Sequence, residues 1–202
     1  MSEVLPVSLD EVFRRAGEFF MKRSPVHAAA RRIVEALMEL NIPFAVVGAM
    51  SANAHGHVRT TEDVDLLLTR EGLEAFKSVW LGRGWVELFP GSKGMRDAIC
   101  NVKIDVLLAG EYPGDGKPKP IVFPDPAQVH TETRDGLPVI PLRLLLELKC
   151  ASGMTAEHRP RDLDDVIQLI RRNGLPRNYA IDAWVQAKFD QLWLLAQIDD
   201  DA

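Results

Sequence analysis

The chain has 202 residues, of which 47% are hydrophobic and 26% charged, and its formal net charge is −5. This composition is ordinary for a globular protein, and the length can bury a real core in one domain or two small ones. The lack of any run of about 18 apolar residues argues against a membrane span, and the negative charge argues against broad, non-specific binding of nucleic acid.

The cysteines and the N-terminus indicate a cytoplasmic protein. Cys100 and Cys150 lie far apart in the sequence, and such isolated cysteines suit a reducing compartment better than a metal site or a disulfide framework. The N-terminal stretch MSEVLPVSLDEV lacks the basic start and apolar core of a signal peptide. We therefore expect a cytoplasmic location and no association with a membrane.

Helices and strands follow one another in the first part of the chain. Ser8, with Glu11 three residues on, forms a capping-box pattern that predicts a helix beginning at residue 8. Apolar spacing, glycines and prolines mark the other boundaries. Helices are expected at residues 8–22, 24–40, 49–55 and 71–83. Strands are expected at residues 44–47, 64–68, 85–88, 98–102 and 103–108.

The remainder of the chain is predicted to be mainly helical. Residues 112–126 are rich in Gly, Pro and Lys and are typical of a long loop. The prolines within residues 136–141 remove donors from a β-ladder, so a short strand there is expected at a sheet edge. Helices are expected at residues 142–151, 161–172 and 179–197. The predicted fold class is α+β, a mixed sheet with flanking helices, divided into N-terminal helices (1–40), a core (41–126) and a mostly helical C-terminal subdomain (127–202).

Two carboxylates, Asp63 and Asp65, stand two positions apart in an apolar strand. They therefore lie on one face, where they repel each other unless a cation lies between them, and carboxylate oxygens are the ligands that Mg²⁺ prefers. A third acid, Asp105, interrupts the strand at residues 103–108. If the two strands are neighbours, the three acids form a metal cradle suited to phosphoryl chemistry. The alternative is that Asp63 and Asp65 are solvated residues at a strand entrance.

A glycine turn precedes the acidic strand. Gly48 follows the apolar run at residues 44–47 and opens a short helix of small residues, whose free N–H groups suit a phosphate. Gly48 lets the backbone approach a ligand closely, and the hydroxyl of Ser51 is a further donor. By itself, a lone glycine favours a simple strand-to-helix turn, and the phosphate-binding interpretation stays open beside it.

The order of these features resembles the nucleotidyltransferase superfamily related to DNA polymerase β. Its pattern is an apolar strand, then Gly-Gly or Gly-Ser, a short spacer, Asp-x-Asp, and a third acid on a later strand. Gly48-Ala49 is similar to the first motif, Asp63 and Asp65 to the second, and Asp105 to the third. The resemblance implies a nucleotidyltransferase fold with its core at residues 41–126.

One branch of the superfamily is most similar to this chain. The stretch GHVRTTEDVD, residues 56–65, resembles minimal nucleotidyltransferases of the AbiEii toxin type and antibiotic nucleotidyltransferases. Lys149 in an apolar helix, followed by RDLDD at residues 161–165, is also similar to the AbiEii-type branch. The resemblance spans about residues 42–170 and leaves the N-terminal helices and the last helix outside it.

The resemblance implies a metal-dependent mechanism. Asp63 and Asp65 would hold Mg²⁺ on a nucleoside triphosphate, while Asp105 would complete a second metal site and help deprotonate the acceptor hydroxyl. A nucleoside monophosphate would move to the acceptor and pyrophosphate would leave. Catalysis of this kind consists mainly of positioning and charge neutralisation.

The resemblance also implies which residues bind the nucleotide. Gly48 and Ser51 would hold the triphosphate, Lys149 would reach the nucleotide from the helical part, and Arg59 would contact phosphate or acceptor. On the residues alone, Lys149 is better explained as a surface lysine whose stem covers apolar side chains, whereas Arg59 is equally well explained as a solvated arginine. Ala49 departs from the family pattern, because it keeps the backbone N–H but lacks a hydroxyl and some freedom of close approach.

Three functions are compatible with the sequence. The first is a toxin-like enzyme that transfers a nucleotide to RNA or protein, and an antitoxin would then be a partner. The second is an enzyme that modifies a hydroxyl of an antibiotic or another small molecule, for which an acidic acceptor pocket is expected if the acceptor is cationic. The third is a catalytically inactive binding module, which the alanine after Gly48 keeps open and the three acids argue against.

Overall fold

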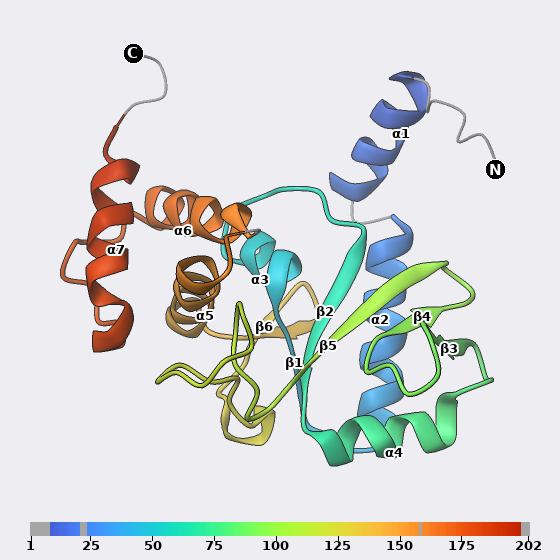
Figure 1. Cartoon of the computed structure of the whole chain (residues 1–202). Coiled ribbons are helices and arrows are strands. Elements are labelled where there is room, and N and C mark those ends of the chain that lie inside the picture. The colour runs from blue at the N-terminus through green and yellow to red at the C-terminus, as the bar shows by residue number, and fades with distance from the viewer. Residues whose placement is uncertain (1–8, 21–23, 158, 199–202) are drawn as a thin grey trace.

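A seven-stranded mixed sheet forms the centre of the molecule (Figure 1). The computed structural model describes residues 9–20, 24–157 and 159–198, so Ser8 and the predicted capping box lie outside the described residues. The strand order is β3-β4-β5-β2-β1-β7-β6. The strands are β1 (Phe44–Val46), β2 (Asp63–Leu68), β3 (Trp85–Glu87), β4 (Met95–Asp97), β5 (Val102–Leu108), β6 (Glu132–Arg134) and β7 (Leu137–Val139).

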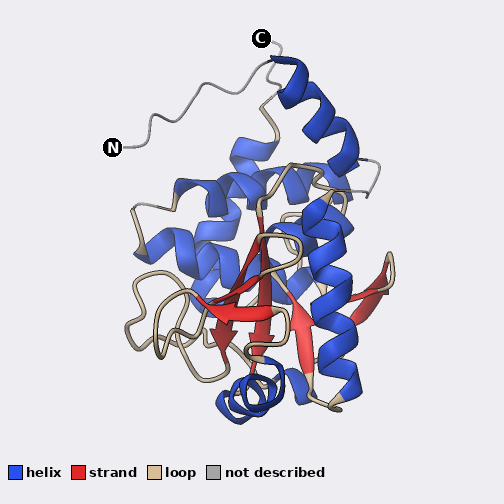
Figure 2. Cartoon of the chain, turned by 90° about the vertical axis from the view of Figure 1, so that its right-hand side faces the viewer, coloured by secondary structure: helices blue, strands red, loops and turns tan. Residues whose placement is uncertain are grey.

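Helices cover both faces of the sheet, and the predicted α+β class is confirmed (Figures 1 and 2). They are α1 (Leu9–Phe20), α2 (Pro25–Glu39), α3 (Gly48–Ala54), α4 (Arg70–Trp80), α5 (Leu142–Thr155), α6 (Pro160–Asn173) and α7 (Ala183–Ala196), with a 3₁₀ turn at Pro126–Gln128. None of the helices in the described part of the chain combines the length and apolar composition that crossing a membrane requires.

Two hydrophobic cores sandwich the sheet. On β2 the side chains of Val64, Leu66 and Leu68 pack with α2 and α4, whereas Leu67 faces the core made by α3, α5, α6 and α7. This alternation follows from the two-residue repeat of a strand. Asp63 and Asp65 therefore share the face of Leu67, and they point toward the side on which α5 lies.

Parallel pairing brings the two acidic strands together. β2 and β5 run parallel, with Asp65 opposite Asp105 and Asp63 opposite Lys103. β1 pairs antiparallel with β2 on its other side, and β7 runs parallel to β1. The sheet therefore takes strands from both sides of residue 126, and β6 and β7 belong to it together with the strands of residues 44–108.

Two predicted strands need correction. Residues 98–101 form a turn and not a strand, because Asp97 Oδ1 accepts hydrogen bonds from the backbone N–H groups of Ile99 and Cys100, and Asn101 has a φ of 54°. The strand on that side of the sheet is β4, which ends at Asp97. β7 is not at the sheet edge, since it lies between β1 and β6. Pro138 is tolerated because only one register pair, Val46 with Val139, joins β7 to β1.

Candidate active site

Asp65 and Asp105 stand side by side at the centre of the sheet and line the same cavity. The condition set by the sequence, that the two acidic strands be neighbours, is met by the direct pairing of β2 with β5. Asp63 lies two register rows away, opposite Lys103, and does not line the cavity; its Oδ1 accepts a hydrogen bond of 2.7 Å from the hydroxyl of Thr61.

Gly48 lies directly beneath the carboxylate of Asp65. It has a φ of +60°, and a Cβ atom built on it would lie 1.9 Å from Asp65 Oδ2. The backbone N–H of Ala49 donates to the same carboxylate, and the N–H of Val47 donates to the backbone oxygen of Asp65 at 3.0 Å. Only glycine fits this position, because any side chain would displace the acid and would force a left-handed backbone on an L residue.

Ser51 lies elsewhere. Its side chain is fully buried within α3, it does not line the cavity, and its hydroxyl has no hydrogen-bond partner among the described residues. The structure therefore brings Gly48 and Ala49 to the cavity with the acids but does not bring Ser51 there.

The acids and their surroundings perturb each other. Burial raises the pKa of Asp65 to about 6, and the negative charges of Asp63 and Asp105 add to this effect, while Lys149 and the N–H of Ala49 oppose it. Lys103 Nζ donates to Asp105 Oδ2 at 2.7 Å, and this hydrogen bond raises the pKa of Lys103. The site therefore combines closely spaced carboxylates with one ammonium group, that of Lys103, which lies two positions before Asp105 on the same strand.

Lys149 is the centre of a buried ionic cluster and not a surface lysine. It forms ion pairs with Asp162 at 2.9 Å and with Asp165 at 2.6 Å, and its side chain is only 7% exposed. Burial lowers the pKa of Lys149, but the two carboxylates outweigh burial and raise it. Ser152 donates to the second oxygen of Asp162 at 2.6 Å. The lysine therefore stays charged at the border of the cavity.

Arg59 joins this cluster from the other half of the molecule. Its Nε and Nη2 donate to the two oxygens of Asp165 at 2.8 and 3.0 Å, and His57 Nε2 lies 3.1 Å from Asp165 Oδ1. Burial raises the pKa of Asp165, but Lys149 and Arg59 together bring it below its ordinary value. Asn53 holds the backbone of Arg59 through two hydrogen bonds, of 2.8 and 2.9 Å. The loop before β2 is thereby fastened to α6.

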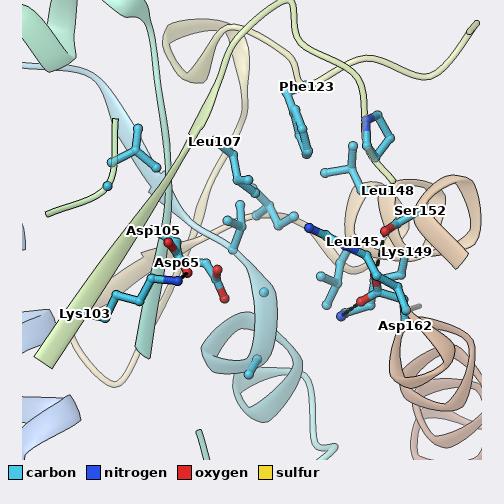
Figure 3. A pocket seen from close by; sticks show the side chains of 18 of the residues that line it. Asp65, Lys103, Asp105, Leu107, Phe123, Leu145, Leu148, Lys149, Ser152 and Asp162 are labelled. Carbon is cyan, nitrogen blue, oxygen red and sulfur yellow. Dashed lines mark hydrogen bonds and ion pairs between the residues drawn. The ribbon is translucent and has the colours of Figure 1, made fainter. Parts of the chain in front are cut away.

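The cavity between these two groups has a volume of about 410 Å³, with Asp65, Lys103 and Asp105 on one side and Lys149 and Asp162 on the other (Figure 3). Its charged lining residues are the acids Asp65, Asp105 and Asp162 and the cations Arg59, Lys93, Lys103, Lys149 and Arg159. Its apolar lining residues include Leu107, Pro113, Phe123, Ile140, Leu145 and Leu148. Among the described residues, no ion pair of Arg159 is found, whereas each of the other four cations contacts a carboxylate.

The lining residues that sequence reasoning missed include Lys93, Lys103, Phe123 and Arg159. The sequence could have indicated Lys103, because it precedes Asp105 by two positions and so lies on the same face of the strand. The other three lie in loops, or at a helix start, that only the folded chain brings to the cavity. Over the described residues, no group of three or more His, Cys, Asp or Glu side chains is arranged to hold a metal ion.

This sheet and its helices define a nucleotidyltransferase-like fold. A crystal structure of ANT(2")-Ia in complex with adenylyl-2"-tobramycin is similar to it, with a TM-score of 0.51 and 13% sequence identity over 81% of this chain and 96% of that chain. A solution structure of the antibiotic-resistance factor ANT(2'')-Ia has a TM-score of 0.49 and 12% identity over 82% of this chain and 89% of that chain. No protein-family model and no curated protein sequence matches the chain.

Proposed function

We propose that the protein is a Mg²⁺-dependent nucleotidyltransferase that moves a nucleoside monophosphate from a nucleoside triphosphate to a hydroxyl of a small molecule. The observation that carries the proposal is the pairing of Asp65 with Asp105 on parallel strands, above a glycine turn that leaves space for no side chain. The nucleotidyltransferase-like fold supports it, because nucleotidyl transfer is the chemistry for which these acids are suited.

The donor set fits a hard divalent cation. It consists of carboxylate oxygens alone. Burial is the main cause of the raised pKa of Asp65, and the negative charges of Asp63 and Asp105, which a cation would compensate, raise it further. Asp65, Asp105 and Asp63 are the residues that would hold Mg²⁺, although Asp63 is bound to Thr61 and would contribute through its other oxygen. Bound Mg²⁺ would neutralise the triphosphate and polarise the phosphoryl group that is transferred.

The cations of the cavity suit a triphosphate. Lys149 and Arg59 are fixed by Asp162 and Asp165, so they present positive charge at the border of the cavity without the entropy cost of ordering a mobile side chain. Arg159 has no described ionic partner and is free to contact phosphate. Ala49 keeps its N–H at the turn, but this group already donates to Asp65.

The acceptor in this proposal is a small molecule, because the similar protein of known structure holds adenylyl-2"-tobramycin, a small molecule that carries an adenylyl group. The lining of the cavity has more cations than acids, so it does not suit a polycationic acceptor. We therefore favour an uncharged or anionic hydroxyl compound that packs on the apolar lining residues near Phe123. The alternative acceptor is RNA or a protein, as in AbiEii-type toxins with an antitoxin partner.

Nucleotide binding is the first test of the proposal. Calorimetry with each of the four nucleoside triphosphates, with and without Mg²⁺, should give metal-dependent binding to the wild type and loss of binding in the double variant Asp65→Asn, Asp105→Asn. The matched control is Asp164→Asn, since Asp164 is exposed and lies outside the cavity. A folded protein that binds no triphosphate under any condition would show that the chain is a binding module and not an enzyme.

Transfer is the second test. The protein is incubated with the preferred triphosphate, labelled on its α-phosphate, and with a panel of uncharged, anionic and polycationic hydroxyl compounds, total RNA, or a protein extract. We expect label in a small-molecule product together with release of pyrophosphate. Label found only in RNA or protein would establish the toxin-like alternative in place of the small-molecule acceptor.

A further inference from the structure

Lys103 stands where the acids of the site meet. It precedes Asp105 by two positions on β5, and so shares its face, and it lies opposite Asp63 in the register with β2. Its Nζ donates to Asp105 Oδ2 at 2.7 Å (Figure 3). The ammonium group thus comes from the same short segment as the third acid of the site and is directed at it.

The ammonium and a metal ion compete for Asp105. An oxygen that accepts a short, charge-assisted hydrogen bond is less available as a metal ligand, and a nearby positive charge repels a second cation. The side chains of Lys103 and Asp105 are 43% and 31% exposed, so no wall of the protein separates them from solvent or an entering ion. The positions and charges of Lys103 and the acids therefore decide whether Asp105 binds the ammonium or a metal ion.

The surroundings keep Lys103 on the acids. In the register between β4 and β5, Arg96 lies opposite Lys103, and Arg96 Nη1 donates to Asn101. Turning Lys103 away from Asp105, toward β4, would move its ammonium toward this second cation. On the other side lie the three carboxylates of Asp63, Asp65 and Asp105, all of which act on the ammonium of Lys103. Their three negative charges equal the charge of one divalent cation together with that lysine.

We propose that Lys103 takes the place of a second metal ion, so that this site holds a single divalent cation on Asp65, while Lys103 compensates the charge of Asp105. The inference rests on the proposed function, since it assumes that the acids hold a metal ion, and it narrows that function to a one-metal site. Lys103 acts through Asp105 and is a positioning residue. The two-metal arrangement that the sequence resemblance implies would then not apply to this chain.

Counting bound metal ions tests the proposal without any activity measurement. The full-length chain is titrated with Mn²⁺ alone, and the free ion is quantified by its electron paramagnetic resonance signal. The triple variant Asp63→Asn, Asp65→Asn, Asp105→Asn defines the background from other surface acids. We expect one ion per chain above this background for the wild type and two for Lys103→Met.

Two further variants separate the role of Lys103 from a general effect of charge. Lys103→Arg should retain one ion, because it keeps a cation next to Asp105. Lys93→Met removes another lysine of the same cavity, one that pairs with Glu111, and should also retain one ion. Circular dichroism verifies that each variant is folded, and the partial exposure of Lys103 makes Lys103→Met compatible with the core.

The possible failures are distinguishable. Two ions on the wild type, or one ion on a folded Lys103→Met variant, would overturn the proposal for Lys103 and leave the nucleotidyltransferase function standing. No ion above background on either protein would overturn the metal-dependent function together with the proposal. The count on the wild type decides between one and two ions even if Lys103→Met does not fold.

Discussion

Replacing Asp65 with asparagine should stabilise the metal-free protein at neutral pH. In the folded chain, burial and the charges of Asp63 and Asp105 raise the pKa of Asp65 from 3.8 to about 6. This difference corresponds to about 3 kcal/mol of free energy that the folded state gives up when the group is ionised. Asparagine keeps an oxygen for the N–H of Ala49 and removes the charge, so we expect a gain of about 2–3 kcal/mol at pH 7.5.

The gain should depend on pH in a defined direction. A carboxyl group with a raised pKa holds its proton more tightly in the folded than in the unfolded chain, so its contribution to stability is largest at low pH. The wild type loses this contribution as pH rises from about 4 to about 6, and the Asp65→Asn variant has none to lose. The stability difference between the two proteins should therefore be small at pH 4 and constant above about pH 6.5.

Urea denaturation of both proteins in EDTA, at pH 4 and pH 7.5, measures this difference, with Asp164→Asn as the control of equal chemistry at an exposed position. Mg²⁺ should reverse the order at pH 7.5, since only the wild type gains stability from binding an ion. An Asp65→Asn variant that is no more stable than the wild type at pH 7.5 without metal would refute the claim that burial and the neighbouring acids make the ionised form of Asp65 unfavourable in the folded state.

Two other substitutions test the turn and the ionic cluster. Gly48→Ala should weaken triphosphate binding at least about tenfold in calorimetry, because its methyl group would displace Asp65. The control is Gly91→Ala, which should bind triphosphate normally, since Gly91 also has a positive φ, of +77°, but no atom lies within 4 Å of the new Cβ. Asp165→Asn should cost about 3 kcal/mol in urea denaturation, since it removes one of the two carboxylates that compensate buried Lys149 and the carboxylate that Arg59 contacts. The pKa of Asp165 is lowered, so this cost should be present at neutral pH and vanish as pH falls through that lowered pKa, and an unchanged cost in acid would contradict it.

The strand positions of the acids could be predicted because they depend on local rules. The two-residue repeat of β2 and β5 assigns Val64, Leu66, Ile104 and Val106 to one face and the acids to the other. The wrong prediction of a strand at residues 98–102 has an equally local cause. A run of apolar and small residues favoured a strand, but the carboxylate of Asp97 accepts hydrogen bonds from the backbone N–H groups of Ile99 and Cys100 and so forms a turn.

The role of Lys149 in the structure could not be predicted from local rules. A lysine in an apolar helix suits a surface position equally well, and only the packing of α5 against α6 buries it between Asp162 and Asp165. The same limit applies to Arg59, whose partner Asp165 is 106 positions away in the sequence. Long-range ion pairs leave no periodic pattern, so the sequence indicates the residue types but not which of them meet.

The ionic cluster explains how one cavity can draw on two parts of the chain. Asp65 and Asp105 belong to strands of the sheet, whereas Lys149, Asp162 and Asp165 belong to helices α5 and α6. Arg59, four positions before the start of β2, donates two hydrogen bonds to Asp165 and so links these parts. A change of charge at Asp165 would therefore act on the geometry of the cavity as well as on stability. In the proposed function, a nucleotide bound together with Mg²⁺ would strengthen the same connection, because the metal ion would pair with the acids of the sheet and the phosphates with Lys149 and Arg59.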